Sequence, residues 1–358
     1  MPYYPGLKNK EFDNRREFIA QKLIALREGL LKNIPYKTLN DNLLVATWNL
    51  RDFGREPGHG FNPEPRLGES FYYIAEIISR FDLIAVQEVN EDLDDFRRLM
   101  RILGGSYDYI ATDVTEGPGG NKERMVFVFD RRKINFRNIA GEIVLPNKAP
   151  YDGIQFARTP FVVSFQCGWL KFDICTAHLY YGEESGEKYE KRVDEIKHLA
   201  GFMAERAERT GTNTFILGDF NVVGPDDKTW NALNDSPFKV PEKIKTIPSN
   251  ALRTKHYDQI AFRSVQDEVK IKGKQKESAG TFDFYNYVFE SGNASDYKDV
   301  AKNLGDITKF DTWRTWQMSD HLPLWIELET DFAETYLNKL KNKESVSSVG
   351  VLPQADFK

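Results

Sequence analysis

The chain has 358 residues, and its 49 Lys and Arg against 54 Asp and Glu give a formal net charge of −5. This balance excludes the strong overall basic field typical of many nucleic-acid-binding proteins, although an enzyme with an acidic metal site carries it easily. The length suffices for one large domain or two ordinary ones. Two cysteines, Cys167 and Cys175, offer neither a disulfide framework nor zinc-ligand spacing, so we expect core thiols.

Nothing in the chain predicts insertion into a membrane. The segment Met1-Pro2-Tyr3-Tyr4-Pro5 lacks a basic stretch followed by an apolar one, and no apolar run approaches the roughly 18 residues of a membrane span. We therefore expect a soluble, cytoplasmic protein without a membrane span. No protein partner can be inferred from the sequence.

Three regions are expected along the chain. Residues 11–33 place apolar side chains at helical spacing, which predicts an amphipathic helix within an N-terminal extension over residues 1–40. The helix is expected to pack on the main domain, with contact to a partner as the alternative. The main domain is predicted over residues 41–330, and residues 331–358 are predicted to form a short helix and a disordered tail.

Within the main domain, apolar runs predict buried strands that end in polar side chains, with helices over 69–80, 92–103 and 187–209. The runs 43–50, 83–89 and 172–179 end at or near Asn49, Glu88 and His178, and a polar head, Asp320-His321, precedes the last run. A carboxylate such as Glu88 at the end of so apolar a strand is costly unless a cation or a donor compensates it. This cost favours a functional role for Glu88 over a plain salt bridge.

The segment Gly218-Asp219-Phe220-Asn221 follows another apolar run, 213–217. Because strand side chains alternate, Asp219 and Asn221 are expected to face the same way and to pair a carboxylate with an amide. A carboxylate binds a hard cation or orients water, and an amide donates to an oxyanion. Ordinary turn chemistry explains an Asp-x-Asn segment equally well, and the sequence leaves both interpretations open.

In order and in type, these strand ends resemble those of the endonuclease/exonuclease/phosphatase superfamily, with the closest match to deoxyribonuclease-I-like enzymes. The segments that carry the resemblance are Lys122-Glu123-Arg124, Ala157-Arg158-Thr159-Pro160, Gly218-Asp219-Phe220-Asn221, Tyr257-Asp258 and Ser319-Asp320-His321. The resemblance implies an α/β fold, a four-layer sandwich of two mixed β-sheets packed face to face with flanking helices.

Three departures accompany this resemblance. Val222-Val223-Gly224 stand where secreted deoxyribonucleases carry a disulfide, which agrees with a reducing compartment. A polar insert over 291–312 precedes Ser319-Asp320-His321 and leaves the substrate preference open. The strand Tyr257-Asp258-Gln259-Ile260 differs from the Cys-Asp-Arg-Ile pattern of inositol polyphosphate phosphatases.

Phosphodiester hydrolysis requires an activated water, a counter-charge and an acid for the leaving oxygen. Oxygen ligands from Glu88, Asn49 and Asp320 suit Mg²⁺ or Mn²⁺. Imidazoles titrate near neutrality, which makes His178 and His321 the expected acid and base.

The resemblance implies further roles. A carboxylate orients each histidine, Asp219 orients the attacking water, and Asn221 holds a phosphate oxygen. The expected histidine pairs are Glu123 with His178 and Asp258 with His321. Arg158 and Arg124 are candidate phosphate ligands, with surface ion pairs as the equal alternative.

The sequence thus predicts a metal-dependent phosphodiester hydrolase, and more narrowly an endonuclease that nicks duplex DNA with low sequence specificity. The first alternative is a phosphatase or phospholipase of the same superfamily, acting on a small phosphoester or a lipid headgroup. A catalytically silent binding scaffold is a minor alternative, because no expected histidine or metal carboxylate is missing.

Overall fold

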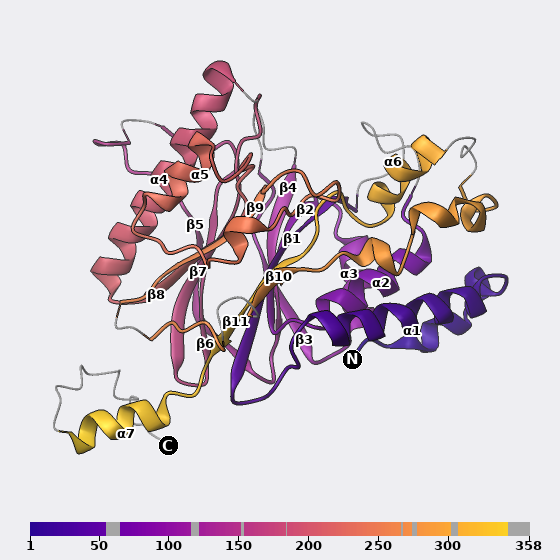
Figure 1. Cartoon of the computed structure of the whole chain (residues 1–358), viewed down its shortest axis with the longest axis horizontal. Coiled ribbons are helices and arrows are strands. Elements are labelled where there is room, and N and C mark those ends of the chain that lie inside the picture. The colour runs from indigo at the N-terminus through magenta and orange to yellow at the C-terminus, as the bar shows by residue number, and fades with distance from the viewer. Residues whose placement is uncertain are drawn as a thin grey trace.

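Two β-sheets pack face to face at the centre of the molecule, and helices cover their outer faces (Figure 1). The structure is a computed structural model that describes residues 1–54, 65–115, 122–151, 154–183, 185–265, 268–273, 278–301 and 307–342. The predicted tail after the last helix lies outside these residues. The layered arrangement confirms the α/β sandwich predicted from the sequence.

Within the described residues the first sheet has six strands in the order β10-β11-β1-β2-β4-β3. β1 and β2 run parallel, and the other neighbours run antiparallel. The strands are β1 (Asn42–Phe53), β2 (Leu83–Asn90), β3 (Tyr107–Ala111), β4 (Glu123–Asp130), β10 (Ala279–Thr281) and β11 (Leu324–Glu329).

The second sheet has five described strands in the order β5-β6-β7-β8-β9. Here β7 and β8 form the parallel pair. The strands are β5 (Ile134–Glu142), β6 (Phe161–Cys167), β7 (Leu170–His178), β8 (Asn213–Asp219) and β9 (Asp258–Arg263).

Helices form the two outer layers. The first sheet is covered by α1 (Arg16–Asn33), α2 (Gly68–Ile78) and α3 (Asp94–Leu103), and the second by α4 (Gly186–Thr210) and α5 (Lys228–Asn234) (Figure 1). The remaining helices are α6 (Ile307–Gln317), α7 (Ala333–Lys341) and the 3₁₀ turns η1 (Tyr4–Lys8), η2 (Lys10–Phe12), η3 (Ile244–Thr246), η4 (Phe284–Asn286) and η5 (Ser291–Tyr297).

β4 shows why the strands read as continuous apolar runs. Met125, Phe127 and Phe129 belong to the core between the sheets, where the Phe127 ring lies 5.8 Å from that of Phe161. The alternate residues Val126 and Val128 belong to the core beneath the helices. Because both faces of the strand are buried, both sets of side chains must be apolar.

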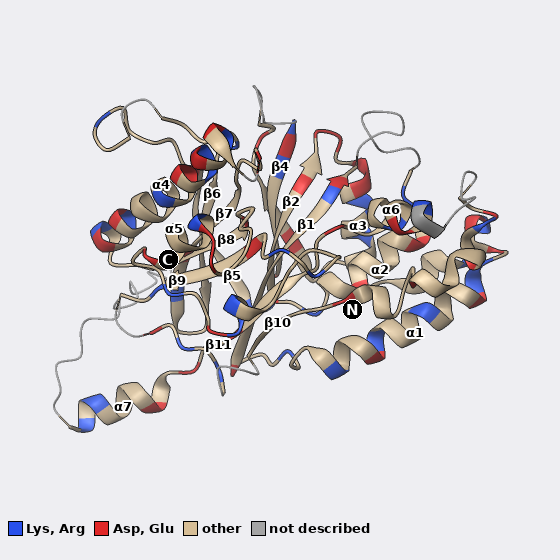
Figure 2. Cartoon of the chain, turned by 45° about the horizontal axis from the view of Figure 1, so that its top comes forward, with Lys and Arg blue, Asp and Glu red and all other residues tan. Residues whose placement is uncertain are grey.

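α1 packs on the main domain, as predicted. Its residues Ile19, Leu23, Leu26 and Leu30 are buried in the core under the helices. Charged residues of both signs alternate along its outer face and along α4, in keeping with the near-neutral composition (Figure 2). Every helix in the described part of the chain is too short or too polar to cross a lipid bilayer.

The polar insert predicted over residues 291–312 also contributes buried aromatic side chains in the part that the structure describes. Tyr297 and Phe310 are buried, and the Tyr297 ring stacks on that of Phe289 at 4.7 Å and lies 5.7 Å from that of Trp313. The aromatic residues are far apart in the sequence, so their cluster forms only when η5 and α6 meet. The composition of this segment in the sequence shows the polar residues that lie between these aromatic residues.

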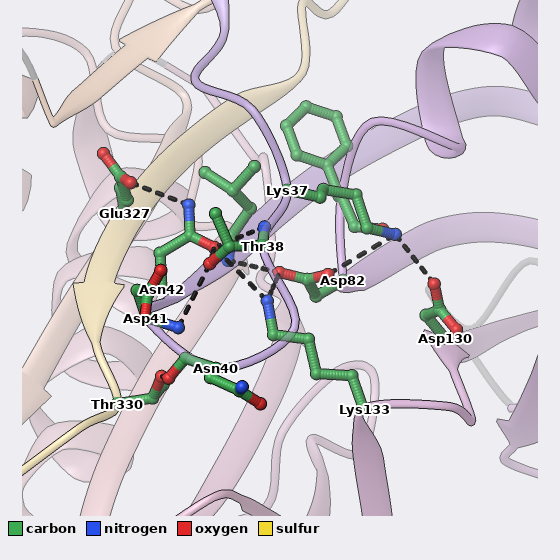
Figure 3. A network of polar contacts seen from close by, with 12 residues as sticks. Lys37, Thr38, Asn40, Asp41, Asn42, Asp82, Asp130, Lys133, Glu327 and Thr330 are labelled. Carbon is green, nitrogen blue, oxygen red and sulfur yellow. Dashed lines mark hydrogen bonds and ion pairs between the residues drawn. The ribbon is translucent and has the colours of Figure 1, made fainter.

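A buried network of polar side chains connects several segments of the chain at the edge of the first sheet where β1 and β2 begin (Figure 3). Asp82, fully buried, accepts hydrogen bonds from Lys133 Nζ at 2.7 Å and from the Leu44 N–H at 2.9 Å. Lys37 Nζ lies 3.0 Å from Asp130 Oδ2 and 3.4 Å from Asp82 Oδ1. The network therefore ties the segment before β1 to the starts of β2 and β5.

We expect Lys133→Met to lower the free energy of unfolding by about 3 kcal/mol, because removing one partner leaves a buried carboxylate without its nearest cation. Urea unfolding followed by circular dichroism measures the change. Lys188→Met is the control, since Lys188 pairs with Glu183 on the exposed surface, where an ion pair contributes little to stability. Equal effects for the two variants would contradict the prediction.

Candidate active site

The polar residues predicted at strand ends gather at one edge of the sandwich. The parallel pairs β1–β2 and β7–β8 bring the carboxyl ends of neighbouring strands together. In register, His178 lies beside Asp219, and Asp219 lies beside Asp258 on β9. The sheet topology alone therefore collects side chains from distant parts of the sequence.

Asp219 lies between two histidines. Its Oδ2 atom is 3.6 Å from His178 Nε2 and 3.6 Å from His321 Nε2. The opposite ring nitrogen of each histidine meets a second carboxylate: His178 Nδ1 is 3.1 Å from Glu123 Oε2, and His321 Nδ1 is 2.8 Å from Asp258 Oδ2. The structure thus places each histidine against the carboxylate predicted to orient it, and both Nε2 atoms face one carboxylate.

Glu88 joins this cluster through Asn49. Asn49 Nδ2 donates to Glu88 Oε1 at 2.7 Å and to Asp219 Oδ2 at 3.1 Å. The Asp52 N–H donates to Glu88 Oε2 at 2.8 Å, and His178 Nε2 lies 3.9 Å from Glu88 Oε1. Asn49 and Glu88 of the first sheet therefore form one connected group with His178 and Asp219 of the second.

The backbone around this group is strained. Glu88 has φ 59°, Arg51 has φ 46°, Asp52 has φ 48° and Asn221 has φ 52°. Non-glycine residues adopt this left-handed region at a cost and keep it only where the surroundings impose it. At Glu88 the bonds from Asn49 and Asp52 hold the carboxylate in place.

A hard divalent cation fits the donor set. Glu88, Glu123 and His178 each offer a ligand atom, and these atoms lie within 4.8 Å of one another. Glu88 is the ligand common to this group and to the predicted set of Glu88, Asn49 and Asp320. Among the described residues, no hydrogen bond or ion pair joins Asp320 to that set; its carboxylate lies 3.5 Å from Arg51 Nη1 instead. Its part in metal binding stays a prediction.

The surroundings separate the pKa values of the two histidines. Burial, followed by the charge of Arg158, lowers the pKa of His178 to about 4. At His321 burial acts in the same direction, but the charges of Asp258 and Asp219 outweigh it and raise the pKa well above its ordinary value. Near neutral pH His178 is therefore neutral and His321 is charged.

The carboxylates are also shifted. Burial raises the pKa of Asp219, against the lowering effect of His321 and His178. Burial would raise the pKa of Glu88 as well, but the charge that His178 carries in its protonated form and the hydrogen bonds from Asn49 and Asp52 outweigh it and lower that pKa. Glu88 therefore stays ionised, the form that binds a cation.

The two candidate arginines lie in different places. Arg158 is 7% exposed and its guanidinium pairs with Glu123, so it lies inside the cluster and is no surface residue. The structure does not bring Arg124 to the cluster. Strand alternation turns it away from Glu123, and its Nη1 donates to the Thr112 carbonyl at 2.8 Å and lies 3.1 Å from exposed Asp113. A phosphate contact by either arginine stays a prediction.

Asn221 shows the turn chemistry that the sequence left open. β8 ends at Asp219, so the strand alternation expected to align the two side chains does not extend to Asn221. The Asn221 N–H donates to Asp219 Oδ1 at 3.0 Å, and its Nδ2 donates to the Leu179 carbonyl at 2.9 Å. One amide hydrogen remains for a phosphate oxygen, and that role stays a prediction.

Sequence reasoning missed two arginines that border the group. The Arg51 guanidinium stacks 3.8 Å above the ring of Trp316 in α6. Arg66 donates to the carbonyls of Met318, at 2.8 Å, and of Leu50, so it links the end of β1 to the segment before Asp320. Arg66 follows a stretch rich in Pro and Gly and has no sequence signal, because its partners are main-chain carbonyls.

Paired histidines and carboxylates at one edge of a two-sheet sandwich are the arrangement that the sequence predicted for a hydrolase of phosphoester bonds. The chain belongs to the Endonuclease/Exonuclease/phosphatase family, whose model matches residues 46–318. A curated relative named Deoxyribonuclease, from Thioalkalivibrio sp. (strain K90mix), is 24% identical over 245 residues, which are 67% of this chain. The chain spans 59% of that relative's length.

Solved structures show the same fold. The chain matches D. rerio TDP2 complexed with single strand DNA product with a TM-score of 0.52 and 12% identity, over 80% of this chain and 98% of that one. It matches a mannosyl-6-phosphatase from Bacteroides thetaiotaomicron with a TM-score of 0.51 and 17% identity, over 80% and 99% of the two chains. At such identities the likeness concerns the fold alone.

Proposed function

We propose that this protein is a metal-dependent phosphodiester hydrolase, and specifically an endonuclease that nicks duplex DNA with little sequence specificity. The observation that carries the proposal is the position of Asp219 Oδ2, 3.6 Å from the Nε2 atoms of two histidines that are themselves held by carboxylates. This arrangement supplies an orienting carboxylate with a base on one side and an acid on the other.

Each residue has a defined task in this proposal. Neutral His178 accepts the proton of the attacking water at Nε2, and Asp219 orients that water. Charged His321 donates from Nε2 to the leaving oxygen, while Asp258 stabilises its charge from the other side of the ring. When bound near Glu88, Mg²⁺ or Mn²⁺ supplies positive charge that offsets the developing charge on the phosphate oxygens.

The choice of substrate has support from the relatives. The curated relative is named a deoxyribonuclease, and a protein of the same fold was solved with a DNA product. The phosphatase alternative has support of the same kind, since a mannosyl-6-phosphatase shares the fold to a similar degree. The cytoplasmic location stays a prediction.

The test incubates the protein with supercoiled plasmid and, in parallel, with p-nitrophenyl phosphate and a phosphorylated inositol, each with Mg²⁺ and with EDTA. We expect open circles before linear product, and no cleavage in EDTA. The His321→Ala protein, purified identically, controls for contaminating nuclease. Intact plasmid together with rapid phosphate release would replace the endonuclease with the phosphatase.

The pKa shifts predict an unusual pH profile. Activity requires neutral His178 and charged His321, so it is lost as pH falls through the lowered pKa of His178, about 4, or rises through the raised pKa of His321. We therefore expect kcat/KM on the cleaved substrate to show no transition near about pH 6.5, where a free histidine titrates. A half-maximal point near that pH would contradict the two protonation states.

A further inference from the structure

α4 turns two buried charged side chains toward the loops beside the cluster of Glu88, His178, Asp219 and His321, the proposed catalytic group. Arg192 is 0% exposed and Glu195 is 2% exposed, and neither belongs to the residues that touch Asp219 or the two histidines. They lie three residues apart, so they share one face of the helix. Burying a charge is costly unless strong hydrogen bonds compensate it. The partners of these two side chains are therefore informative.

Arg192 binds two main-chain carbonyls. Its Nη1 donates to the Asn221 carbonyl at 3.0 Å, and its Nη2 donates to the Glu183 carbonyl at 2.9 Å. The guanidinium carbon also lies 5.3 Å from the ring centre of Tyr189 and 5.5 Å from that of Tyr181. Arg192 thus joins the segment after β8 to the segment between β7 and α4.

Glu195 binds two main-chain amides from different loops. Its Oε1 accepts from the Ala157 N–H at 2.9 Å, and its Oε2 accepts from the Tyr180 N–H at 2.8 Å. An ionised carboxylate presents only acceptors, so each oxygen serves one amide. Glu195 thus joins the segment before β6 to the segment after β7.

All these loops lead directly to the catalytic group. Asn221, with φ 52°, donates its N–H to Asp219 Oδ1, so the carbonyl that Arg192 binds belongs to the strained residue that orients Asp219. On the other side, Ala157 precedes Arg158, whose guanidinium pairs with Glu123, the partner of His178. One helix face therefore reaches Asp219 by one path and His178 by another.

We propose that Arg192 and Glu195 form an anchor on α4 that positions Asp219 and His178 for catalysis. Arg192 holds the left-handed turn at Asn221. Glu195 holds the segment that precedes Arg158 and the segment that follows His178. Both are positioning residues, since neither touches the reacting atoms. The kinetic consequence rests on the proposed hydrolase function, whereas the anchoring is a property of the fold alone.

Three variants test the anchor. Arg192→Met keeps the volume and removes the donors, whereas Arg192→Lys keeps a cationic donor. Glu195→Gln places an amide NH₂ against a main-chain N–H. Arg206→Met is the matched control, because Arg206 is on the same helix but its Nε lies 3.3 Å from Asp173 Oδ2, among none of these loops. Circular dichroism and the melting temperature establish that each variant is folded.

Amide hydrogen exchange measures the anchoring without any substrate. We expect exchange to be about tenfold faster at Asn221 in Arg192→Met and at Ala157 and Tyr180 in Glu195→Gln, the scale of a lost hydrogen bond to a charged group. Arg206→Met should leave all three amides unchanged. Exchange that stays unchanged at those amides in Arg192→Met and Glu195→Gln overturns the anchor.

Kinetics measure the positioning, on whichever of the three phosphoesters the wild type hydrolyses. We expect kcat to fall about 100-fold in Arg192→Met, the scale of a catalytic group misplaced by about 1 Å, with KM within about twofold and partial recovery in Arg192→Lys. Faster exchange with unchanged kcat overturns the positioning role.

If Arg192→Met does not fold, Arg192→Lys and Glu195→Gln decide by the same two readouts. A wild type that hydrolyses none of the substrates refutes the proposed function, and the exchange rates still decide on the anchor.

Discussion

Glu88→Gln is expected to lower the rate of divalent-cation-dependent hydrolysis at least about 1,000-fold while the fold persists. The carboxylate stays ionised in its buried position because Asn49 and the Asp52 N–H donate to it. Removing its charge removes cation stabilisation worth several kcal/mol, and each 1.4 kcal/mol is a factor of ten. Plasmid nicking and calorimetric Mn²⁺ titration measure the two effects.

The matched control for Glu88→Gln is Glu91→Gln, because Glu91 is an exposed carboxylate directly after the strand that carries Glu88 and lies 3.4 Å from Lys122. It should keep wild-type hydrolysis and Mn²⁺ affinity. Full turnover of the wild type in excess chelator, or undiminished Mn²⁺ affinity in Glu88→Gln, would refute the assignment of Glu88 to the cation.

His178→Ala and His321→Ala are each expected to lower kcat about 100-fold or more, the usual scale for a lost general acid or base. The two effects should not add in the double variant, because base and acid act in the same step on either side of Asp219. His198→Ala is the control, since His198 lies on α4 with its ring 5.6 Å from that of Tyr151. It should leave kcat unchanged.

The orienting carboxylates refine this test. Glu123→Gln should resemble a weaker His178→Ala, and Asp258→Asn a weaker His321→Ala, because each change disturbs one imidazole without removing it. A normal kcat in His178→Ala or in His321→Ala would show that its assigned role is wrong. A carboxylate variant more damaging than loss of its histidine would point to direct contact with the substrate.

Most residues of the candidate active site were predicted from the sequence, for a physical reason. In strands buried on both faces nearly every position must be apolar, so a polar side chain at a strand end is conspicuous. Asn49, Glu88, His178 and Asp219 all stand out in this way. The order and type of these ends also carried the resemblance to the endonuclease/exonuclease/phosphatase superfamily, and that resemblance implied the two-sheet sandwich.

The positions of the arginines could not be predicted. Arg158 and Arg124 look equivalent in the sequence, yet one lies inside the catalytic group and the other on the far side of β4. Strand register decides this, since neighbouring residues point to opposite faces. The partners of Arg66 and Arg192 are main-chain carbonyls, which are present at every residue and leave no trace in the sequence.

The sequence by itself therefore determined which residues can do acid–base or metal chemistry, because polar strand ends are local features, and the resemblance that these residues carry implied the fold class. Only the tertiary structure decided which of them meet. Asp219 lies between His178 and His321, which are 143 residues apart in the chain, because parallel strands end at the same edge and the two sheets face each other. Their opposite pKa shifts follow from that packing, since burial and neighbouring charges are properties of the folded chain.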